Sequence, residues 1–439
     1  MEREMKERNV NPNDIALPPG FTIEVFAKEL MTPINITFTD DGEMLVGDAG
    51  ILSGSGKVMK LTENGFDVIA EGFHPPLTGI TYHQGDIFVA HRGFITVVKK
   101  DGTKEDILSG LPSFGDHHNN RVIFGEDGKM YFGQGTATNT GVVGEDNHWV
   151  KEHPYFHDDP GAPIMLTGEN FRTKNVLAKS DNRTAVTGAY SPFGTPSYTG
   201  EIIKGSTKAS GSILRANPDG SNLELVAWGL RNPFRLKFDR FQRLFCGNHG
   251  MDVRGSRPVN NSPDEFQWIQ QGVWYGWPDF TGGLPVTNPE FKPEGKPQPS
   301  FLLAQHPMQP PHPVATFAPH SAIMGFDFNE DPTFGPTNEA YIAEFGSNAP
   351  RTTGGKPLPD VGHRVSRINI ETGEVFPFAI NKTGIADSKT GAGGFERPID
   401  IVFGSRNEMY IADFGLNNPS GGFYPNTGVI WKVTKQTSV

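Results

Sequence analysis

Asp41-Gly-Glu-Met-Leu-Val46 is a turn followed at once by a short apolar strand. The same arrangement recurs at Gly85–Val89, Asp127–Phe132, Phe241–Cys246, Thr337–Ile342 and Arg406–Ile411. Another short strand precedes each copy, so each copy predicts a hairpin of two antiparallel strands. A single hairpin cannot bury both of its apolar faces. Six such hairpins therefore predict an all-β fold, a six-bladed β-propeller of four-stranded antiparallel sheets.

The recurrence runs from near residue 36 to near residue 433 of the 439 residues without a linker. We expect one propeller domain over residues 17–439, preceded by a mobile polar N-terminal lead at residues 1–16. Phe21–Phe26 alternates like a strand, and we expect it to form the outer strand of the last blade beside Val429–Val433. Pairing the two ends of the chain in this way would close the ring without an exposed edge.

The third blade interval is too long for four strands. Its surplus, residues 138–210, predicts a large loop or lid. Extended Pro-rich insertions also follow in blades four and five, at residues 282–319 and 347–362. Because long loops on a rigid scaffold commonly shape binding sites, we expect all three to gather over one face of the propeller.

Composition excludes several classes of protein. Lys+Arg 39 against Asp+Glu 50 gives a net charge of −11, which argues against nucleic-acid or anionic-membrane partners. Cys246 is the single cysteine, so no disulfide within the chain and no Cys-x-x-Cys-His haem attachment can form. Residues 1–20 show no signal peptide and no membrane span. The sequence contains neither a Gly-x-Gly-x-x-Gly nor a Walker motif, which argues against an enzyme that uses a nicotinamide cofactor or ATP.

Asp116-His-His-Asn-Asn-Arg121 comes directly before an innermost strand, which predicts a position at the mouth of the central channel. A histidine such as His117 beside a carboxylate can act as a general base near neutral pH. The alternative is a histidine that only caps the loop. His148, His153 and His157 are interpreted as polar loop residues, because the sequence contains no His-Glu-x-x-His or Cys/His cluster typical of zinc sites.

Gly229-Leu-Arg-Asn-Pro233 occupies the equivalent position in blade four. Arg231 offers a planar fork for a carboxylate, and Asn232 can both donate and accept. Pairing of Arg231 with a structural Asp is the alternative. The Gly-rich turn Gly247–Asp252 exposes carbonyl groups that, with acidic side chains, suit an oxygen-ligated cation such as Ca²⁺. An ordinary turn is the alternative there.

Together, three motifs resemble the glucose/sorbosone dehydrogenase family of soluble quinoproteins. They are Asp116-His-x-x-x-Arg121, Gly229–Pro233, and Asp264-Glu265 followed by Gly272-Val-Trp-Tyr-Gly-Trp-Pro278. The resemblance extends from about Leu17 to Val433. It implies a six-bladed propeller that uses pyrroloquinoline quinone (PQQ) and Ca²⁺ to oxidise the C1 hydroxyl of an aldose, or a related aldehyde.

The resemblance also implies roles for individual residues. His117 would be the base, with Asp116 available to orient it, and Arg231 would contact the reacting quinone oxygen. Cofactor binding would fall to Arg231, Asn232, Arg397 and His249, and the carbonyl groups of Gly250 and Met251 would ligate Ca²⁺. The chain departs from the family pattern at His74, Thr136, Gly346 and Ile399, where a glutamine, an acidic residue, a lysine and an arginine are expected. Arg351, Arg364 and His320 are available to compensate.

Two other functions stay open at this stage. A Ca²⁺-dependent lactonase would need Asp48, Asn120, Asn232 and Asp252 to converge on one ion. A non-catalytic binding propeller would have an aromatic, uncharged mouth, and Trp274, Tyr275 and Trp277 could stack on a sugar in either case. The partners expected are a small sugar, an electron acceptor of unknown identity and, as an open option, a second copy of the chain. The resemblance implies a periplasmic or extracellular location.

Overall fold

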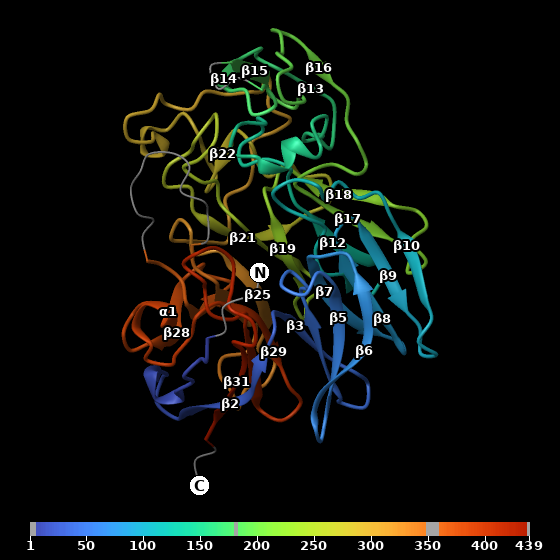
Figure 1. Ribbon diagram of the computed structural model, residues 1–439, viewed down its shortest axis with the longest axis vertical. Coiled ribbons are helices and arrows are strands. Elements are labelled where there is room, and N and C mark those ends of the chain that lie inside the picture. The colour runs from blue at the N-terminus through green and yellow to red at the C-terminus, as the bar shows by residue number, and fades with distance from the viewer. Residues whose placement is uncertain (1–5, 180–182, 348–359, 437–439) are drawn as a thin grey trace.

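The molecule is a ring of antiparallel β-sheets (Figure 1). The computed structural model describes residues 6–179, 183–347 and 360–436. Within these residues, six sheets of four or five strands each contain one of the six predicted hairpins. The all-β, six-bladed propeller predicted from the sequence is confirmed.

The first three blades follow one another along the chain. Blade one contains β3 (Pro33–Phe38), β4 (Met44–Asp48), β5 (Gly56–Thr62) and β6 (Gly65–Phe73). Blade two contains β7 (Leu77–His83), β8 (Asp86–His91), β9 (Phe94–Val98) and β10 (Lys104–Leu108). Blade three contains β11 (Ile123–Phe124), β12 (Met130–Gln134), β17 (Ser212–Ala216) and β18 (Glu224–Trp228).

The last three blades complete the ring. Blade four contains β19 (Pro233–Phe238), β20 (Leu244–Asn248), β21 (Asp264–Ile269) and β24 (Ala315–Phe317). Blade five contains β25 (Ile323–Phe328), β26 (Glu339–Glu344), β27 (Arg364–Asn369), β28 (Val375–Asn381) and the short β1 (Ile15–Ala16). Blade six contains β29 (Pro398–Phe403), β30 (Glu408–Asp413), β31 (Gly428–Lys435) and β2 (Phe21–Leu30).

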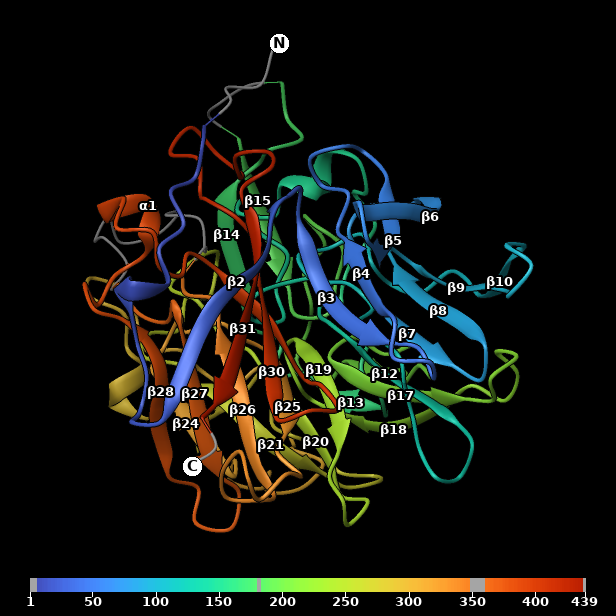
Figure 2. The same ribbon diagram turned by 90° about the horizontal axis from the view of Figure 1, so that it is seen from below.

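The ring is closed by the N-terminal strand β2, which lies beside β31 in Figure 2. Ile23 pairs with Val433 and Val25 pairs with Trp431. The predicted role of this segment as the outer strand of the last blade is confirmed. Burial explains the sequence patterns, because β2 is half exposed whereas β4 and β26 are buried along their whole length between neighbouring blades.

Turn chemistry accounts for the recurring motif. Each of the six hairpin turns contains a residue with a left-handed backbone, a conformation that glycine and asparagine adopt at low cost. These residues are Gly42 (φ 79°), Gly85 (91°), Gly128 (73°), Gln242 (59°), Asn338 (63°) and Asn407 (57°). Five of the six turns therefore select a Gly or Asn by which the hairpin is recognised in the sequence, whereas the blade-four turn has Gln242 at this position.

A second feature that recurs between blades is a side-chain-to-backbone hydrogen bond that holds a loop at the mouth of the ring. The second strand of a blade ends in a buried polar residue whose side chain accepts backbone N–H groups from the loop before the inner strand. Asn248 Oδ1 accepts from the N–H groups of Arg231 and Asn232, both at 3.0 Å. Asp413 Oδ1 accepts from Arg397 N at 2.9 Å. Because β20 and β30 occupy equivalent places in their blades, Arg231 and Arg397 lie at the same end of the ring.

The long insertions form a separate structured region. That of blade three contains η2 (His148–Lys151) and two hairpins, β13 (Ile164–Met165) with β16 (Ile202–Ile203) and β14 (Asn170–Lys174) with β15 (Thr184–Gly188). That of blade four contains β22 (Phe280–Thr281), β23 (Leu284–Pro285) and η3 (Pro289–Phe291). The two share one hydrophobic cluster and lie together beyond the blades in Figure 1. Most of the third predicted insertion, residues 347–362, lies outside the described residues.

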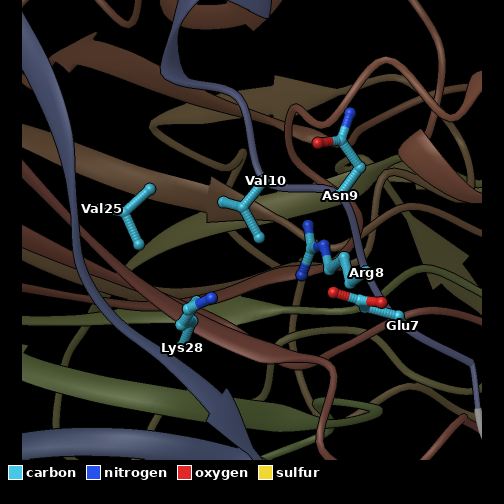
Figure 3. A pocket seen from close by; sticks show the side chains of 6 residues that line it. All are labelled: Glu7, Arg8, Asn9, Val10, Val25 and Lys28. Atoms are coloured by element: carbon cyan, nitrogen blue, oxygen red, sulfur yellow. The ribbon is translucent and has the colours of Figure 1, made fainter.

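The N-terminal lead is held against the propeller from Arg8 onward, so the expectation that it is mobile is wrong there. Arg8 Nη2 lies 2.8 Å from Asp413 Oδ2 and Arg8 Nε lies 3.3 Å from Asp387 Oδ2. Both carboxylates are buried, and they offset the cost of burying the guanidinium. Figure 3 shows Arg8 in a cavity of about 570 Å³ lined also by Val10, Val25 and Lys28.

Helix is scarce in this molecule. Besides the 3₁₀ turns, which include η1 (Pro12–Asp14), the described chain contains the short helix α1 (Asp387–Thr390). None of the helices in the described ranges is long and apolar enough to cross a membrane.

Candidate active site

A cavity of about 610 Å³ lies at the mouth of the ring, where the inner strands begin. One wall is polar and comes from blades three and four together with the blade-three insertion. Its main side chains are Asp116, His117, His118, Asp146, His148, Trp149, Arg231, Asn232, His249, Asp252, Arg254, Asp264 and His320. The opposite wall is apolar and includes Ile34, Ile51, Phe345, Ile399, Phe414 and Phe423 from blades one, five and six.

His117 is held with one ring nitrogen toward the protein. Its Nδ1 lies 2.9 Å from the carbonyl oxygen of Thr136 and 3.1 Å from Thr136 Oγ1. A carbonyl oxygen can only accept, so Nδ1 carries the proton and Nε2 of the neutral ring carries a lone pair. Burial, with the nearby positive charges of Arg231 and Arg254, lowers the pKa of His117 well below its usual value. The ring is therefore an unprotonated proton acceptor at neutral pH.

Asp116 does not orient His117, contrary to the expectation from sequence. Its Oδ2 lies 2.6 Å from Arg254 Nη2, and its Oδ1 accepts hydrogen bonds from Asn147 Nδ2 (3.1 Å) and Trp149 Nε1 (2.9 Å). These partners turn the carboxylate away from the imidazole and toward the start of η2. Asp116 therefore fastens the blade-three insertion to the rim of the cavity.

Thr136 takes over the orienting role, supported by Asp158 of the insertion. The Thr136 hydroxyl donates to the carbonyl oxygen of Thr138 at 2.7 Å, which leaves its oxygen free to accept from His117. Asp158 Oδ1 accepts from Ala137 N at 2.6 Å, and Asp158 Oδ2 from Thr138 N at 3.2 Å. Burial raises the pKa of Asp158 to about 6. The insertion thus fixes the segment that positions the base.

Arg231 presents part of its guanidinium group to the cavity. Arg231 Nη2 lies 2.7 Å from Asp252 Oδ2 and 3.1 Å from Asn139 Oδ1, and Nε donates to the carbonyl oxygen of Asn139. Among the described residues, no acceptor contacts Nη1, which leaves that donor for a ligand. The alternative expected for Arg231 is pairing with a structural Asp. Asp252 is such a partner, yet Nη1 of Arg231 stays open to a ligand.

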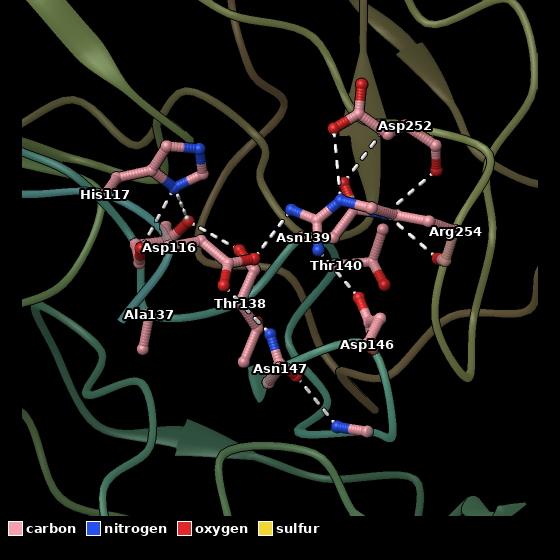
Figure 4. A network of polar contacts seen from close by, with 12 residues as sticks. Asp116, His117, Ala137, Thr138, Asn139, Thr140, Asp146, Asn147, Asp252 and Arg254 are labelled. Carbon is pink, nitrogen blue, oxygen red and sulfur yellow. Dashed lines mark hydrogen bonds and ion pairs between the residues drawn. The ribbon is translucent and has the colours of Figure 1, made fainter. Parts of the chain in front are cut away.

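A buried ionic network joins blade four to the insertion (Figure 4). Arg254 contacts Asp116, Asp146 Oδ2 (2.7 Å) and Asp252 Oδ2 (3.3 Å). Burial would lower the pKa of Arg254, but the three carboxylates together raise it. Asn139, which no sequence pattern distinguishes, joins the same network by accepting from Asp252 N at 2.8 Å. The charge of Arg254 is therefore balanced by protein groups, whereas Arg231 keeps a donor that no acceptor from the described part of the chain contacts.

Asn232, His249 and His320 complete the polar wall. Asn232 Nδ2 lies 3.0 Å from His249 Nδ1, and His249 Nε2 lies 2.8 Å from the carbonyl oxygen of Ile323. Both ring nitrogens of His249 are thus engaged by the protein, so His249 can offer its ring face but no free base. His320 Nδ1 lies 3.2 Å from Asp252 Oδ1.

The turn predicted to ligate Ca²⁺ is fixed by hydrogen bonds from its backbone N–H groups. Gly250 N donates to Asp264 Oδ1 (2.7 Å), and Met251 N donates to Ser262 Oγ (2.6 Å). Within the described residues, neither carbonyl oxygen of this pair accepts a hydrogen bond. No group of three or more His, Cys, Asp or Glu side chains in these residues is arranged to hold a metal ion. Carbonyl oxygens are a ligand type that a hard cation prefers. Gly250 lines the cavity, whereas Met251 is buried and is not part of its lining.

Arg397 lies behind the apolar wall and does not line the cavity. Its Nη1 donates to the carbonyl oxygens of Phe345 (3.1 Å) and Ser347 (2.9 Å), and its guanidinium lies over the Phe345 ring. The sequence-based pairing of Arg397 with a cofactor carboxylate therefore requires movement of residues 345–347. Ile399 does line the cavity, whereas His74 is exposed outside it.

No protein-family model matches the chain. Quinoprotein glucose dehydrogenase B of Acinetobacter calcoaceticus is 25% identical over 179 residues, which are 40% of this chain and 29% of that protein. The PQQ-bound aldose sugar dehydrogenase of Streptomyces coelicolor has a TM-score of 0.55 at 15% identity, over 95% of this chain and 99% of that one.

A third relative is the holo PQQ domain of Coprinopsis cinerea pyranose dehydrogenase, with a TM-score of 0.57 and 14% identity over 96% of this chain and 97% of that one. The chain resembles the soluble quinoprotein sugar dehydrogenases. This agrees with the motif-based resemblance, and the solved structures agree with the fold. By their names these relatives are sugar dehydrogenases, and the curated match spans less than a third of its relative.

The chain differs from the family pattern at Gly346, where the neighbouring residues leave no space for a side chain. Gly346 has φ 84°, and a Cβ atom there would lie 2.5 Å from the ring of His363 and 2.8 Å from the carbonyl oxygen of Val361. His363 is itself fixed by Glu396, because its Nδ1 lies 2.6 Å from the Glu396 carbonyl oxygen. The lysine of the family pattern therefore has no room at this position.

Gly346→Lys should accordingly cost more stability than the same change at an open glycine. Gly54 is the matched control, since its φ is 85° and nothing lies within 4 Å of an added Cβ. We expect Gly54→Lys to lower the free energy of unfolding by about 1 kcal/mol through backbone strain. Gly346→Lys should lose a further ~1–3 kcal/mol through overpacking, measured by urea denaturation. Equal losses in the two variants would contradict this account.

Burial argues against sugar stacking by the aromatic motif, and the partners of the acidic side chains argue against the lactonase alternative. Trp274 is fully buried and Trp277 is 4% exposed, so they pack in the core instead of stacking on a ligand. Asp48 does not point at the cavity, because its carboxylate caps the backbone at Thr32 and Gly50. Asp252 is committed to Arg231, Arg254 and His320. The four side chains of the lactonase hypothesis thus do not converge on one ion.

Buried histidines predict how stability varies with pH. Mainly through burial, the pKa values of His91, His118, His249 and His363 fall from 6.5 to about 4. Between these values each of these histidines binds protons more readily in the unfolded chain, so the four groups make the free energy of unfolding rise with pH. Burial also raises the pKa values of eight acidic groups, which oppose this trend; they are Asp14, Asp146, Asp158, Asp264, Glu265, Glu339, Asp387 and Glu396.

We therefore expect the histidine contribution to appear, in urea denaturation between pH 4.5 and 6.5, as a difference between variants in how the free energy of unfolding changes with pH. His91→Gln removes one of the contributing groups. Its slope over this interval should be smaller by up to about 1.4 kcal/mol per pH unit. A slope unchanged in His91→Gln would refute the assignment.

Proposed function

We propose that this protein is a PQQ-dependent sugar dehydrogenase that oxidises the C1 hydroxyl of an aldose, or a related hydroxyl or aldehyde, with Ca²⁺ as a second cofactor. Three features of one cavity support this function. They are the free Nε2 of His117, the open Nη1 donor of Arg231, and the unpaired carbonyl oxygen of Gly250. All three belong to the polar wall formed by blades three and four.

The residues present fit such a cofactor in two ways. The polar wall supplies Arg231 and Asn232 as donors to a quinone oxygen and the Gly250 carbonyl group as a cation ligand. The facing wall, with Phe345, Phe414 and Phe423, offers apolar contact to a flat ring system. When bound, the quinone would supply the acceptor for the hydride that leaves the substrate carbon.

The chain's own residues would manage the proton and the charge. His117 Nε2 would take the proton of the C1 hydroxyl while the C1–H electron pair departs as hydride, so that C1 gains its second bond to oxygen. The depressed pKa of His117 keeps the imidazole unprotonated before the reaction. Arg231 would stabilise negative charge that develops on the acceptor. The side chains that hold the His117 imidazole and the Arg231 guanidinium in place would be those of Thr136, Asp116 and Arg254.

Spectral titration of the chain with PQQ, with and without millimolar Ca²⁺, tests cofactor binding, and dye reduction with a panel of aldoses tests activity. We expect Ca²⁺-dependent, saturable quinone binding followed by sugar-dependent dye reduction. Arg231→Gln should weaken quinone binding, whereas Arg172→Gln, on the exposed face of β14, should not. Failure to bind quinone at millimolar Ca²⁺ would exclude this function.

The resemblance extends the proposal to location and partners. We propose that the protein works in the periplasm or outside the cell, which activity measurements on separated cell fractions would test. That the protein passes electrons to a further acceptor, and that it pairs with a second copy of the chain, stay predictions from the sequence.

A further inference from the structure

A second cavity, of about 470 Å³, lies at the opposite end of the propeller channel. The active-site cavity is lined by residues near the start of the inner strands, such as Ile34, Phe234 and Ile399. The second cavity is lined by residues further along the same strands, such as Lys237 on β19 and Val402 on β29. Because the inner strands run in one direction along the channel, the two cavities occupy its two ends.

The floor of the second cavity carries two guanidinium groups that share one carboxylate. Arg235 Nη2 forms an ion pair with Asp400 Oδ1, and Arg121 Nη1 lies 3.9 Å from Asp400 Oδ2. Asp400 is fully buried and also accepts a hydrogen bond from Ile36 N at 2.9 Å. Burial lowers the pKa of Arg121 to about 10, and burial with repulsion from Arg121 lowers that of Arg235. At the floor the two guanidinium groups therefore share the single carboxylate of Asp400.

A lysine adds to the positive charge. Lys237 Nζ lies 2.9 Å from Asp327 Oδ1. The carboxylate of Asp327 is also engaged by the backbone, since Oδ2 accepts from Phe403 N at 3.0 Å. The cavity therefore gathers Arg121, Arg235 and Lys237 against two buried carboxylates, Asp327 and Asp400. The remaining acidic residue of its lining, Glu126, is exposed at the rim.

Several donors in this cavity have no protein acceptor within the described ranges. Arg235 is 4% exposed, yet its Nε and Nη1 contact no acceptor there. Arg121 donates from Nε to Thr81 Oγ1 at 2.9 Å, which leaves Nη2 open. Both residues line the cavity, so a ligand or ordered water there could accept from these donors. At the rim, His83 stacks on Phe124 with ring centroids 3.6 Å apart.

We propose that this second cavity binds a small anion through a carboxylate or phosphate group. Guanidinium forks match the geometry of both groups, and three cationic side chains here face two buried carboxylates. Arg235 and Arg121 would donate from the floor, and Lys237 from the side. This site lies at the end of the channel away from the proposed active site and does not depend on the proposed dehydrogenase activity.

Isothermal titration calorimetry with inorganic phosphate, and separately with acetate, tests the proposal at constant ionic strength set with NaCl. We expect saturable one-to-one binding of at least one anion, and the two arms distinguish phosphate from carboxylate recognition. Lys237→Gln should weaken binding by about tenfold through loss of a charge-assisted contact. Arg121→Lys should also weaken binding, because it keeps the charge but loses the fork.

Lys99→Gln is the matched control. Lys99 Nζ forms a similar ion pair, 3.1 Å from Asp86 Oδ2, and its side chain is 40% exposed against 44% for Lys237. This variant should bind the anion like the wild type, and so should Arg231→Gln in the other cavity. Circular dichroism confirms that each variant is folded. Absence of binding in the wild type, or equal affinity in Lys237→Gln and Lys99→Gln, would overturn the proposal.

Discussion

His117→Ala is expected to reduce kcat of the reconstituted enzyme by about 10²–10⁴-fold, the usual contribution of a general base. The substitution removes the unprotonated Nε2 from the cavity wall but takes little volume from the core, because His117 is only partly buried. We therefore expect the thermal unfolding midpoint and quinone affinity to change little. Steady-state dye reduction, together with thermal unfolding of the same preparation, measures both effects.

His118→Ala is the matched control for this prediction. His118 has the same arrangement, with Nδ1 2.9 Å from the carbonyl oxygen of Ser113, and it lines the same cavity. Its charged neighbours are Arg92 and Asp116, whereas those of His117 are Arg231 and Arg254. We expect only a small loss of kcat in His118→Ala. Full activity in His117→Ala would move the base to His118 or to His320, which pairs with Asp252.

Arg254→Met should cause the largest loss of stability among these variants. The Arg254 side chain is 6% exposed, and its guanidinium contacts Asp116, Asp146 and Asp252. Removing one partner of a buried ionic network leaves the others without compensation, which typically costs about 3–5 kcal/mol. Urea denaturation of the apo protein at pH 7 measures the change in the free energy of unfolding.

The control for Arg254→Met is Arg172→Met, which removes an exposed arginine that donates one hydrogen bond to Thr184 Oγ1. Its effect should stay within about 0.5 kcal/mol, as is usual for surface substitutions. Because Asp116 also binds Asn147 and Trp149, Arg254→Met should additionally increase proteolytic cleavage in the blade-three insertion. A stability equal to that of Arg172→Met would show that the network contributes nothing net.

Patterns within short segments predicted much of this protein. The six hairpins, the closing role of Phe21–Phe26 and the mouth positions of His117 and Arg231 follow from alternation, turn residues and the equivalence of the blades. These features depend on backbone geometry over a few residues, and the left-handed turn positions at Gly42 and Asn407 show how directly that geometry selects residue type.

Contacts between distant segments account for the failures. Asp116 is next to His117 in the chain, which suggested a pair, yet Arg254 and the insertion draw its carboxylate away. Asn139 and Asp158 carry no motif, because their roles arise only when the insertion packs on blades three and four. Arg397 matches a family position, but the fold places residues 345–347 between its side chain and the cavity.

Local periodicity and turn chemistry thus were enough for the architecture and for the end of the ring at which the reactive groups lie, since both are properties of a repeated backbone unit. The direction of each buried side chain and the balance of charge at the two ends of the channel were not readable in the chain. They depend on which carboxylates and carbonyl groups arrive from residues more than a hundred positions away, as with Asp116 and Arg254 or Arg121 and Asp400. Burial makes each such pairing strong enough to determine its geometry.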